Sequence, residues 1–428
     1  MNILFFSHRT PYPPHKGTQV RPYNMLAALA ARGHKVHLLA FADENDSPMA
    51  QTELGRICAS VELVHLNPLQ AKINALAALP TKRSLSLAYF GSSRMHQAVR
   101  ELVRLHGIQA MIAFSSTMAQ YVPPDFRKHS IADMTDVDSA KWAHYATRNS
   151  FPRSWIYKIE GQRLKQYEYE IIRSFAYTTL VTHREIGLLT DLDEETRWTR
   201  VVALTNGVDL KQFRPDAFPS FAQDLLPPSE QKFLTDPNAP RIVFTGAMDY
   251  YPNVDAVCYF AQEVFPKIRE QLPNAQFLIV GSGPTQPVLQ LKTIPGVIVT
   301  GRVHDVRPYL AAATVCVIPL RIARGIQNKA LEAMASGRAI IATPEVVAGI
   351  GNVRHEEHLL IAQKTDELTE AVLRIITDTD LRHRLEQQGR EFVEREYDWK
   401  PLMERLAEMV ESIARPAAQG RSRSLAAR

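Results

Sequence analysis

The stretch TVCVIPLRIARGIQNKALEAMASGRAIIATP, residues 314–344, decides the fold. It contains an apolar β-branched run, a loop with a glycine, a helical segment that we expect over 326–336, and a second apolar run. Unbroken apolar runs separated by helices are typical of parallel strands that are covered on both faces of their sheet. The stretch therefore predicts one repeat of an α/β domain.

The helix in this stretch carries an unusual pair of charges. Lys329 lies near its start, where a positive side chain opposes the helix dipole unless an anion docks there. Glu332 follows on the same face, and its carboxylate can accept hydrogen bonds from two vicinal hydroxyls, such as those of a ribose. Together with Gly325 and the free N–H groups of the first turn, the pair predicts a phosphate site. The alternative is a surface ion pair worth only about 0.2–0.5 kcal/mol, in the less favourable order.

Similar runs alternate with helical segments in both halves of the chain. The first half contains NILFFSH, KVHLLAF, AMIAFSS and TTLVTH, and the second contains RIVFTGAM, QFLIVGSG and VIVTGRV. In the first helix, over 21–34, we expect Pro22 in the first turn and Gly33 at the C-cap. The pattern predicts two doubly wound, Rossmann-like α/β domains that face each other across a cleft, with ligands at the carboxyl ends of the strands.

The expected domain boundaries follow from changes in composition. A proline-rich segment without a sustained period suggests a linker, and a segment with four arginines and no apolar pattern ends the chain. We expect one domain over 1–215, a linker over 216–240 and a second domain over 241–396. A helix over 397–414 and a disordered basic tail over 415–428 should follow.

Composition narrows the cellular setting. Three scattered cysteines, Cys58, Cys258 and Cys316, suggest neither a disulfide framework nor a zinc site, so we expect a reducing cytoplasmic compartment. No apolar run approaches the roughly 20 residues of a membrane span. Residues 1–100 hold eleven Lys or Arg against five Asp or Glu, a balance of +6 against +5 for the whole chain. Without interleaved aromatics this favours an anionic membrane surface or a phosphorylated ligand over nucleic acid.

Several motifs together carry a family resemblance. GIQNKALEAMASG, LTNGVDLKQFRP (204–215), FLIVGSGP (277–284) and KGTQVRPYNMLAALAARGHKVHLLAF resemble the retaining two-domain glycosyltransferases of family four, which have the GT-B fold. YPPHKG, DVDSAKW, FTGAMDYYPNVDAV and RIARGIQNKALEAMA resemble more closely the sugar transferases associated with the PEP-CTERM/exosortase exopolysaccharide system. The resemblance extends over about residues 1–400. It implies that the domain over 1–215 is on the acceptor side, that the domain over 241–396 binds the nucleotide sugar, and that the helix over 397–414 crosses back to the first domain.

The resemblance implies roles for particular residues. Glu332 matches the glutamate that binds the nucleotide ribose, and Lys329 matches the basic residues that bind the diphosphate. Two positions depart from the family pattern: Arg324 stands where the family has a glutamate near the donor sugar, and Gly246 is followed by Ala247 and Met248 instead of basic residues. We expect Arg302 to replace the missing cation, or to pair with Asp305 on the surface. The remaining donor-binding residues are expected to be Gly17, Gly246, Asn253, Asn328 and Arg324.

An Asp-x-Asp pair, Asp136 and Asp138, lies in the first half. Such a pair holds a divalent metal in single-domain glycosyltransferases, but the family resembled here needs none, so we expect no metal and no cofactor beyond the nucleotide-diphosphate sugar. Asp138 is either a helix N-cap or a base on the acceptor side. A basic cluster near the first strand, which includes His8, Arg9 and Arg21, suits an anionic diphosphate or acceptor.

These expectations combine into one activity. A hexosyltransferase would move a sugar, with retention, from a nucleotide sugar to a lipid-linked saccharide acceptor during exopolysaccharide synthesis at the inner face of the cell membrane. Lys329, Arg302 and Asp138 are the expected catalytic residues. Two alternatives remain open: a nucleotide-sugar epimerase of the same architecture, and an inactive nucleotide-sugar-binding subunit, which Arg324 in place of glutamate would suit. The GSGP segment (281–284) lacks the third glycine of a dinucleotide site, which disfavours a dehydrogenase.

Overall fold

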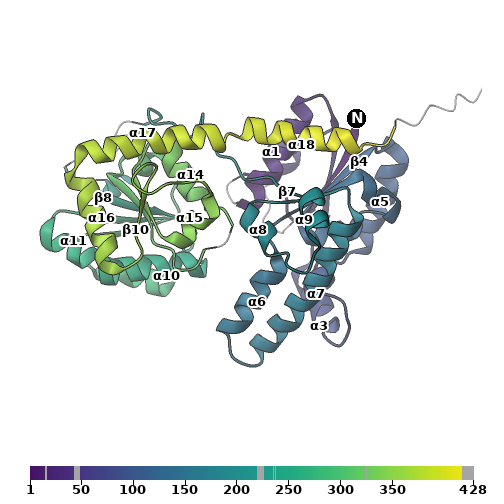
Figure 1. The fold of residues 1–428 in the computed structure, drawn as a ribbon, viewed down its shortest axis with the longest axis horizontal. Coiled ribbons are helices and arrows are strands. Elements are labelled where there is room, and N and C mark those ends of the chain that lie inside the picture. The colour runs from purple at the N-terminus through teal and green to yellow at the C-terminus, as the bar shows by residue number, and fades with distance from the viewer. Residues whose placement is uncertain are drawn as a thin grey trace, which may run out of the picture. The chain divides into compact units, whose positions relative to one another are not determined.

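A computed structural model describes residues 1–14, 17–42, 49–218, 226–234, 236, 238–323 and 325–416 of the chain. It divides into two compact units: Met1–Leu204 with Lys400–Arg428, and Thr205–Trp399. Each unit contains one parallel β-sheet with helices packed on both of its faces (Figure 1). The prediction of two doubly wound α/β domains is therefore confirmed.

The first unit is built on a seven-stranded sheet with the order β3-β2-β1-β4-β5-β6-β7. All of its pairings are parallel. The strand order reverses direction between β1 and β4, which in open α/β sheets is the place where ligands bind. The strands are β1 (Asn2–Ser7), β2 (Lys35–Ala42), β3 (Ser60–His65), β4 (Ala110–Phe114), β5 (Ser130–Thr135), β6 (Tyr177–Leu180) and β7 (Val201–Ala203).

The second unit repeats this arrangement with six parallel strands in the order β10-β9-β8-β11-β12-β13. Its switch point lies between β8 and β11, so the segments that follow these two strands meet at the carboxyl edge of the sheet. The strands are β8 (Arg241–Thr245), β9 (Gln276–Val280), β10 (Val297–Gly301), β11 (Val315–Ile318), β12 (Ile340–Ala342) and β13 (Leu360–Ile361).

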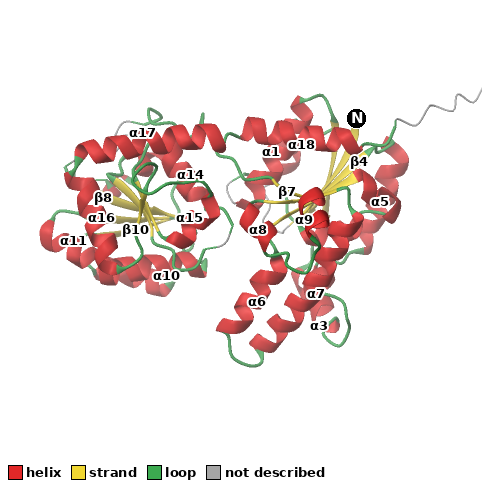
Figure 2. Ribbon diagram, viewed as in Figure 1, coloured by secondary structure: helices red, strands yellow, loops and turns green. Residues whose placement is uncertain are grey.

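Helices connect the strands and cover the sheets (Figure 2). The first unit contains α1 (Gly17–Ala31), α2 (Ala50–Gly55), α3 (Pro68–Ala77), α4 (Leu85–Tyr89), α5 (Ser93–His106), α6 (Asp138–Arg148), α7 (Arg153–Ser174), α8 (His183–Gly187) and α9 (Glu194–Arg200). The second contains α10 (Tyr251–Tyr259), α11 (Phe265–Gln271), α12 (Gln286–Gln290), α13 (Arg307–Ala311), α14 (Asn328–Ala335), α15 (Pro344–Ile350), α16 (Thr365–Thr377) and α17 (Thr379–Glu396), and α18 (Trp399–Ile413) follows. A π-helical turn, Phe260–Val264, joins α10 to α11.

Two details of α1 bear on its prediction. Gly33 follows the helix with φ +85°, and its N–H donates to the Ala30 carbonyl at 2.9 Å, so the predicted C-terminal glycine is confirmed. Pro22 lies inside the helix and not in its first turn, because the helix begins at Gly17. The placement of Pro22 was therefore wrong.

The described residues of the expected linker and of the expected tail make contacts with the two units. Residues 205–240 are part of the second unit, where the carboxylate of Glu230 accepts hydrogen bonds from the Tyr309 hydroxyl and the His304 N–H, both at 2.9 Å. The chain from Lys400 onward is part of the first unit, and Glu411 of α18 pairs there with Arg32 at 2.8 Å. Arg415 lies 3.7 Å over the Phe126 ring, and residues 417–428 of the expected tail lie outside the described residues.

Candidate functional site

Two glycines bring strand ends together at the carboxyl edge of the second sheet. Gly246 follows β8 with φ +156°, and Gly281 follows β9 with φ +153°. A Cβ atom on Gly281 would overlap the carbonyl oxygen of Gly246. A Cβ atom on Gly246 would lie 2.8 Å from both the Lys329 Nζ and the Asn253 Nδ2. Only glycine at these positions leaves room for the lysine and the asparagine beside the end of β8.

Lys329 is held against this edge by two contacts. Its Nζ donates to the Asn253 Oδ1 at 2.6 Å and lies 4.1 Å from the centroid of the Phe244 ring. The Asn253 amide is itself fixed, because its Nδ2 donates to the Ala247 carbonyl at 2.8 Å. A neutral amide and an aromatic face orient an ammonium group without neutralising it. The cation is thus positioned while its charge remains available to an anion.

Lys329 and Glu332 belong to α14, which starts at the switch point of the sheet. Gln327 precedes the helix, and no side-chain hydrogen bond caps the first turn. The first turn of an uncapped helix presents unpaired N–H groups that suit phosphate oxygens. Asn328, the first helical residue, accepts a hydrogen bond from the Asn206 Nδ2 at 3.3 Å. Among the described residues, no hydrogen bond joins the Glu332 carboxylate to another side chain.

Burial moves the pKa of both ionisable groups toward neutrality. It lowers the pKa of Lys329 to about 7, and the opposing attraction of Glu332 is the smaller effect. It raises the pKa of Glu332 to about 7, against the attraction of Lys329. Two desolvated groups of this kind are stabilised in their charged forms by a ligand that brings a negative charge to the lysine and hydroxyl donors to the carboxylate. A nucleoside diphosphate provides both.

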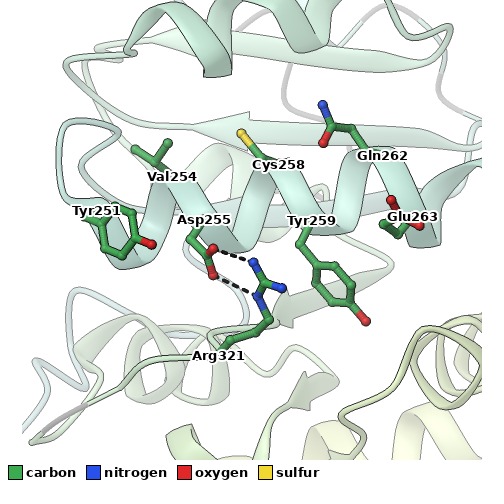
Figure 3. A pocket seen from close by; sticks show the side chains of 8 residues that line it. All are labelled: Tyr251, Val254, Asp255, Cys258, Tyr259, Gln262, Glu263 and Arg321. Atoms are coloured by element: carbon green, nitrogen blue, oxygen red, sulfur yellow. Dashed lines mark hydrogen bonds and ion pairs between the residues drawn. The ribbon is translucent and has the colours of Figure 1, made fainter. Parts of the chain in front are cut away.

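The segment between β11 and α14 is fixed at both ends. Arg321 donates to the Asp255 carboxylate through both Nε, at 2.9 Å, and Nη2, and its guanidinium lies 4.9 Å from the Tyr259 ring centroid (Figure 3). These residues line an open cavity of about 460 Å³ along α10. At the other end, a Cβ atom on Gly349 of α15 would overlap the Gly325 carbonyl oxygen. Arg321 and Gly325, on either side of Arg324, thus each pack against a neighbouring helix.

The structure brings some of the expected donor residues together and leaves others apart. Gly246, Asn253 and Lys329 are in contact, with Glu332 one turn along α14. Arg302 follows β10 on the same edge and is exposed, and among the described residues no hydrogen bond joins it to Lys329 or Asn253. The alternative pairing of Arg302 with Asp305 is wrong, because Asp305 binds Arg307 at 2.6 Å. Arg324 lies outside the described residues, and of Gly17 the structure describes only that α1 begins there.

The two acidic residues of the Asp-x-Asp pair lie at the carboxyl edge of the first sheet. Asp138 is the first residue of α6 and accepts a hydrogen bond from the Ser116 hydroxyl at 3.3 Å. Val137 occupies the N-cap position and Asp138 makes no capping hydrogen bond, so the N-cap alternative for Asp138 is wrong. Burial raises the pKa of Asp138, and burial with the nearby charges of Glu185 and Asp138 raises that of Asp136 to about 7.

Backbone strain accompanies these acids. Ser115 and Thr135, which lie at the ends of β4 and β5, have φ values of +83° and +64°. Positive φ is unfavourable for a β-branched residue such as Thr135, and strain of this kind is concentrated at functional sites. Within the described residues, no group of three or more His, Cys, Asp or Glu side chains is arranged to hold a metal ion.

Two residues of the basic cluster expected near β1, Arg21 and His8, have structural contacts. Arg21 is buried and its Nε donates to the Asp133 carboxylate at 2.7 Å, so Arg21 stabilises the core of the first unit. His8 stacks on Phe114 with ring centroids 5.5 Å apart, and burial lowers its pKa to about 4. A neutral histidine cannot attract a diphosphate by charge. Each histidine taken alone was expected to be structural, which agrees with His8. The cluster also included His15 and Lys16, which lie outside the described residues.

Sequence reasoning also missed several residues of the donor edge. Phe244, Gly281, Asp255 and Arg321 lie within the quoted motifs, but nothing in a single sequence distinguished them from the other residues of those motifs. Asn206 could have been noticed, since it belongs to the LTNGVD motif quoted above. Its contact with Asn328 explains how two distant motifs meet. Pro215 of the same motif packs beside Gly337, where a Cβ atom would lie 2.9 Å from the Pro215 Cγ.

Part of the second unit is similar to a known protein family. Residues 239–378 match the family model described as glycosyl transferases, group 1. Over 228 residues the chain is 28% identical to the GDP-mannose-dependent monoacylated alpha-(1-6)-phosphatidylinositol monomannoside mannosyltransferase of Corynebacterium glutamicum. The match covers 50% of this chain and 56% of that protein, so the chain spans little more than half of the length of its curated relative.

Solved structures support the fold over nearly the whole chain. Sucrose-phosphate synthase from Thermosynechococcus elongatus has a TM-score of 0.68 at 19% identity, covering 96% of this chain and 99% of that one. Anabaena HepE in complex with UDP-glucose has a TM-score of 0.65 at 15% identity, covering 96% and 100%. At these identities the likeness establishes the fold alone. The chain thus has the two-domain GT-B fold, and the stretch that matches the family model lies in its second half.

Proposed function

We propose that the chain is a retaining hexosyltransferase that moves a sugar from a nucleotide-diphosphate sugar to a lipid-linked saccharide in exopolysaccharide synthesis. The observation that carries the proposal is the position of Lys329. Its desolvated amine lies beside the uncapped start of α14, with Glu332 one turn away, in a domain that matches group 1 glycosyl transferases. Anabaena HepE, a structural neighbour, has been solved with UDP and with UDP-glucose.

In this proposal the donor binds along the first turns of α14. The Glu332 carboxylate accepts hydrogen bonds from the ribose hydroxyls, and Lys329 with the N–H groups at Asn328 receives the diphosphate. Gly246 admits the phosphates close to the strand end, and Asn253 keeps the ammonium group aimed at them. Arg302 and Arg324 are the further cations proposed for the diphosphate or for a carboxylate on the sugar.

The transfer breaks the bond between the anomeric carbon and the diphosphate oxygen and forms a bond to an acceptor hydroxyl. The diphosphate departs with the bonding electron pair, so negative charge grows beside Lys329 and is stabilised there. The acceptor hydroxyl loses its proton, and Asp138 is the proposed recipient. Its neighbour Asp136, with a pKa of about 7, can pass a proton to solvent at neutral pH. No divalent metal takes part in this scheme.

A membrane-bound acceptor is supported by three observations. The name of the Corynebacterium glutamicum relative describes a lipid acceptor, a monoacylated phosphatidylinositol monomannoside. Residues 1–100 carry an excess of positive charge. On α3, Leu69, Ile73 and Leu76 follow a helical spacing and are 71%, 58% and 64% exposed, an apolar face that suits a bilayer surface. Of the described helices, none combines the length and apolar character that crossing a membrane requires.

The test is a turnover assay with a panel of nucleotide sugars and membrane lipid extract as the acceptor. We expect one donor to release its nucleoside diphosphate in the presence of extract, and NMR of the product to show the anomeric configuration of the donor. Conversion of the sugar without extract would indicate an epimerase instead. Tight donor binding without any turnover would indicate a binding subunit.

A further inference from the structure

A groove runs along the helical hairpin formed by α6 and α7 in the first unit. The hairpin projects beyond the sheet, and its tip lies at the far end from the strands (Figure 1). Its helices pack closely because a Cβ atom on Gly161 would lie 3.2 Å from the Ser139 carbonyl and 3.3 Å from the Ala143 nitrogen. The groove has a volume of about 780 Å³, and Leu188 and Leu189, which follow α8, form its third wall.

The two helices contribute different side chains to this groove. α7 contributes Trp155, Lys158, Gln162, Lys165 and Tyr169, which are three or four residues apart and therefore share one helical face. α6 contributes mainly small side chains, including Ala140, Ala143 and Ala146. The lining contains two lysines and no carboxylate. Such a surface suits a ligand with a long apolar part and a negative charge.

The two ends of the groove differ. At the inner end, Val137 and Ser139 flank Asp138, the proposed acceptor-side base. At the outer end, Trp155 is 52% exposed, and Phe151 at the tip of the hairpin is 79% exposed. Exposed aromatic side chains at the end of a projecting element are typical of a membrane interface. A chain lying in the groove would therefore lead from a bilayer to the reacting hydroxyl.

We propose that this groove binds the hydrocarbon chain of a phosphate-linked lipid acceptor, with its phosphate at Lys158 and Lys165. The inference rests on the proposed function, because it locates the lipid part of that acceptor. Volumes of this size accommodate drug-sized or lipid-sized ligands. Lys158 is exposed, while Lys165 forms an ion pair with Asp191 at 2.5 Å whose partners are 41% and 58% exposed. Such an exposed pair is weak enough for a phosphate to compete with the carboxylate.

The experiment measures binding by calorimetry with dodecyl phosphate below its critical micelle concentration. Dodecyl maltoside, which has the same chain without the charge, is the comparison ligand. Ala143→Trp fills the groove, and Lys158→Glu reverses the charge in it. Both positions are exposed, so the variants should fold, which circular dichroism verifies. Ala31→Trp places the same tryptophan on an exposed position of α1 outside the groove and serves as the control.

We expect dodecyl phosphate to bind the unaltered protein at least tenfold more tightly than dodecyl maltoside. Ala143→Trp should weaken binding tenfold or more, Lys158→Glu severalfold, and Ala31→Trp not at all. Absence of binding, equal binding of the two ligands, or unchanged binding by Ala143→Trp would overturn the inference. No donor is present in the measurement, so its result is independent of sugar transfer: loss of transfer with intact binding refutes only the proposed function.

Discussion

At the scale of single residues, the proposed donor site depends on a lysine whose pKa is lowered by burial. Lys329 has an aromatic ring and an amide beside it, and among the described residues no carboxylate forms a salt bridge with it. Its charged form is therefore incompletely stabilised until an anion arrives. Glu332 is in the complementary situation, because its carboxylate lacks donors until hydroxyl groups reach it. A ligand that is anionic at one end and carries hydroxyl groups at the other would stabilise both charged side chains.

The shifted pKa values of Lys329 and Glu332 predict that nucleoside diphosphate binds most tightly near pH 7. Below pH 7 the raised pKa of Glu332 leaves the carboxyl protonated, so binding must release a proton and affinity falls as the pH falls. Above pH 7 the lowered pKa of Lys329 leaves the amine neutral, so binding must take up a proton and affinity falls as the pH rises. Each limb should approach about tenfold per pH unit.

Nucleoside diphosphate affinity, measured by calorimetry between pH 5.5 and 9 for two variants, assigns the acid and the alkaline loss of affinity to their residues. Glu332→Gln should abolish the acid-side loss of affinity, and Lys329→Ala should abolish the alkaline one. Lys292→Ala, at an exposed lysine of the same unit, should change neither. Affinity that is flat across this range in the unaltered protein would show that neither group contacts the ligand.

At the scale of elements, the segment between β11 and α14 is held by close backbone packing. Gly349 lies within α15, where alanine would otherwise favour the helix by about 1 kcal/mol. Because a Cβ atom there would overlap the Gly325 carbonyl, we expect Gly349→Ala to displace the segment and to weaken donor binding at least tenfold. Gly187→Ala, in α8 with nothing within 4 Å of the new Cβ atom, is the matched control. Unchanged donor affinity in Gly349→Ala would mean that the segment takes no part in binding.

The sequence predicted the strands with long apolar runs and missed the short strands β7 and β13 and the two strands that a charged residue interrupts. β5 was not predicted because Asp133 interrupts its apolar run, and only the structure shows that Arg21 neutralises this carboxylate. β3 was missed because Glu62 alternates with partly buried neighbours at one edge of the sheet. Within the candidate site, the Lys329–Glu332 pair could be predicted from the sequence because both residues lie on one helix. The contacts of Lys329 with Phe244 and with the Asn253 side chain depend on strand order, which a single sequence does not contain.

At the scale of the whole molecule, the account predicts salt-dependent attachment to anionic membranes. The excess positive charge of residues 1–100 should draw the protein to anionic liposomes, and 1 M salt should reverse this, because it shortens the screening length to about 3 Å. Leu69→Ser and Ile73→Ser, in the exposed face of α3, should weaken the attachment that remains at moderate salt. Flotation assays measure both effects. Equal flotation with neutral liposomes would refute the electrostatic part.

Transfer is also expected to proceed without a divalent metal, since Lys329, Arg302 and the start of α14 supply the positive charge. Activity should therefore survive exhaustive treatment with EDTA, and added manganese should not increase it. An activity that EDTA abolishes and manganese restores would instead assign Asp136 and Asp138 as metal ligands. Replacing Asp136 with asparagine would then lower manganese affinity in parallel with activity.

The most direct test of the donor site compares ligand binding and turnover in the Glu332→Gln and Lys329→Ala variants. Glu332→Gln should weaken the binding of donor and of free nucleoside diphosphate alike, by about 1.5–3 kcal/mol, because both ligands contain the ribose. Lys329→Ala should reduce kcat more than donor affinity, because the charge it stabilises grows as the glycosidic bond breaks. The measurement is donor and diphosphate affinity, together with kcat, for both variants. Wild-type turnover in Lys329→Ala together with normal binding by Glu332→Gln would contradict the account and place the donor elsewhere.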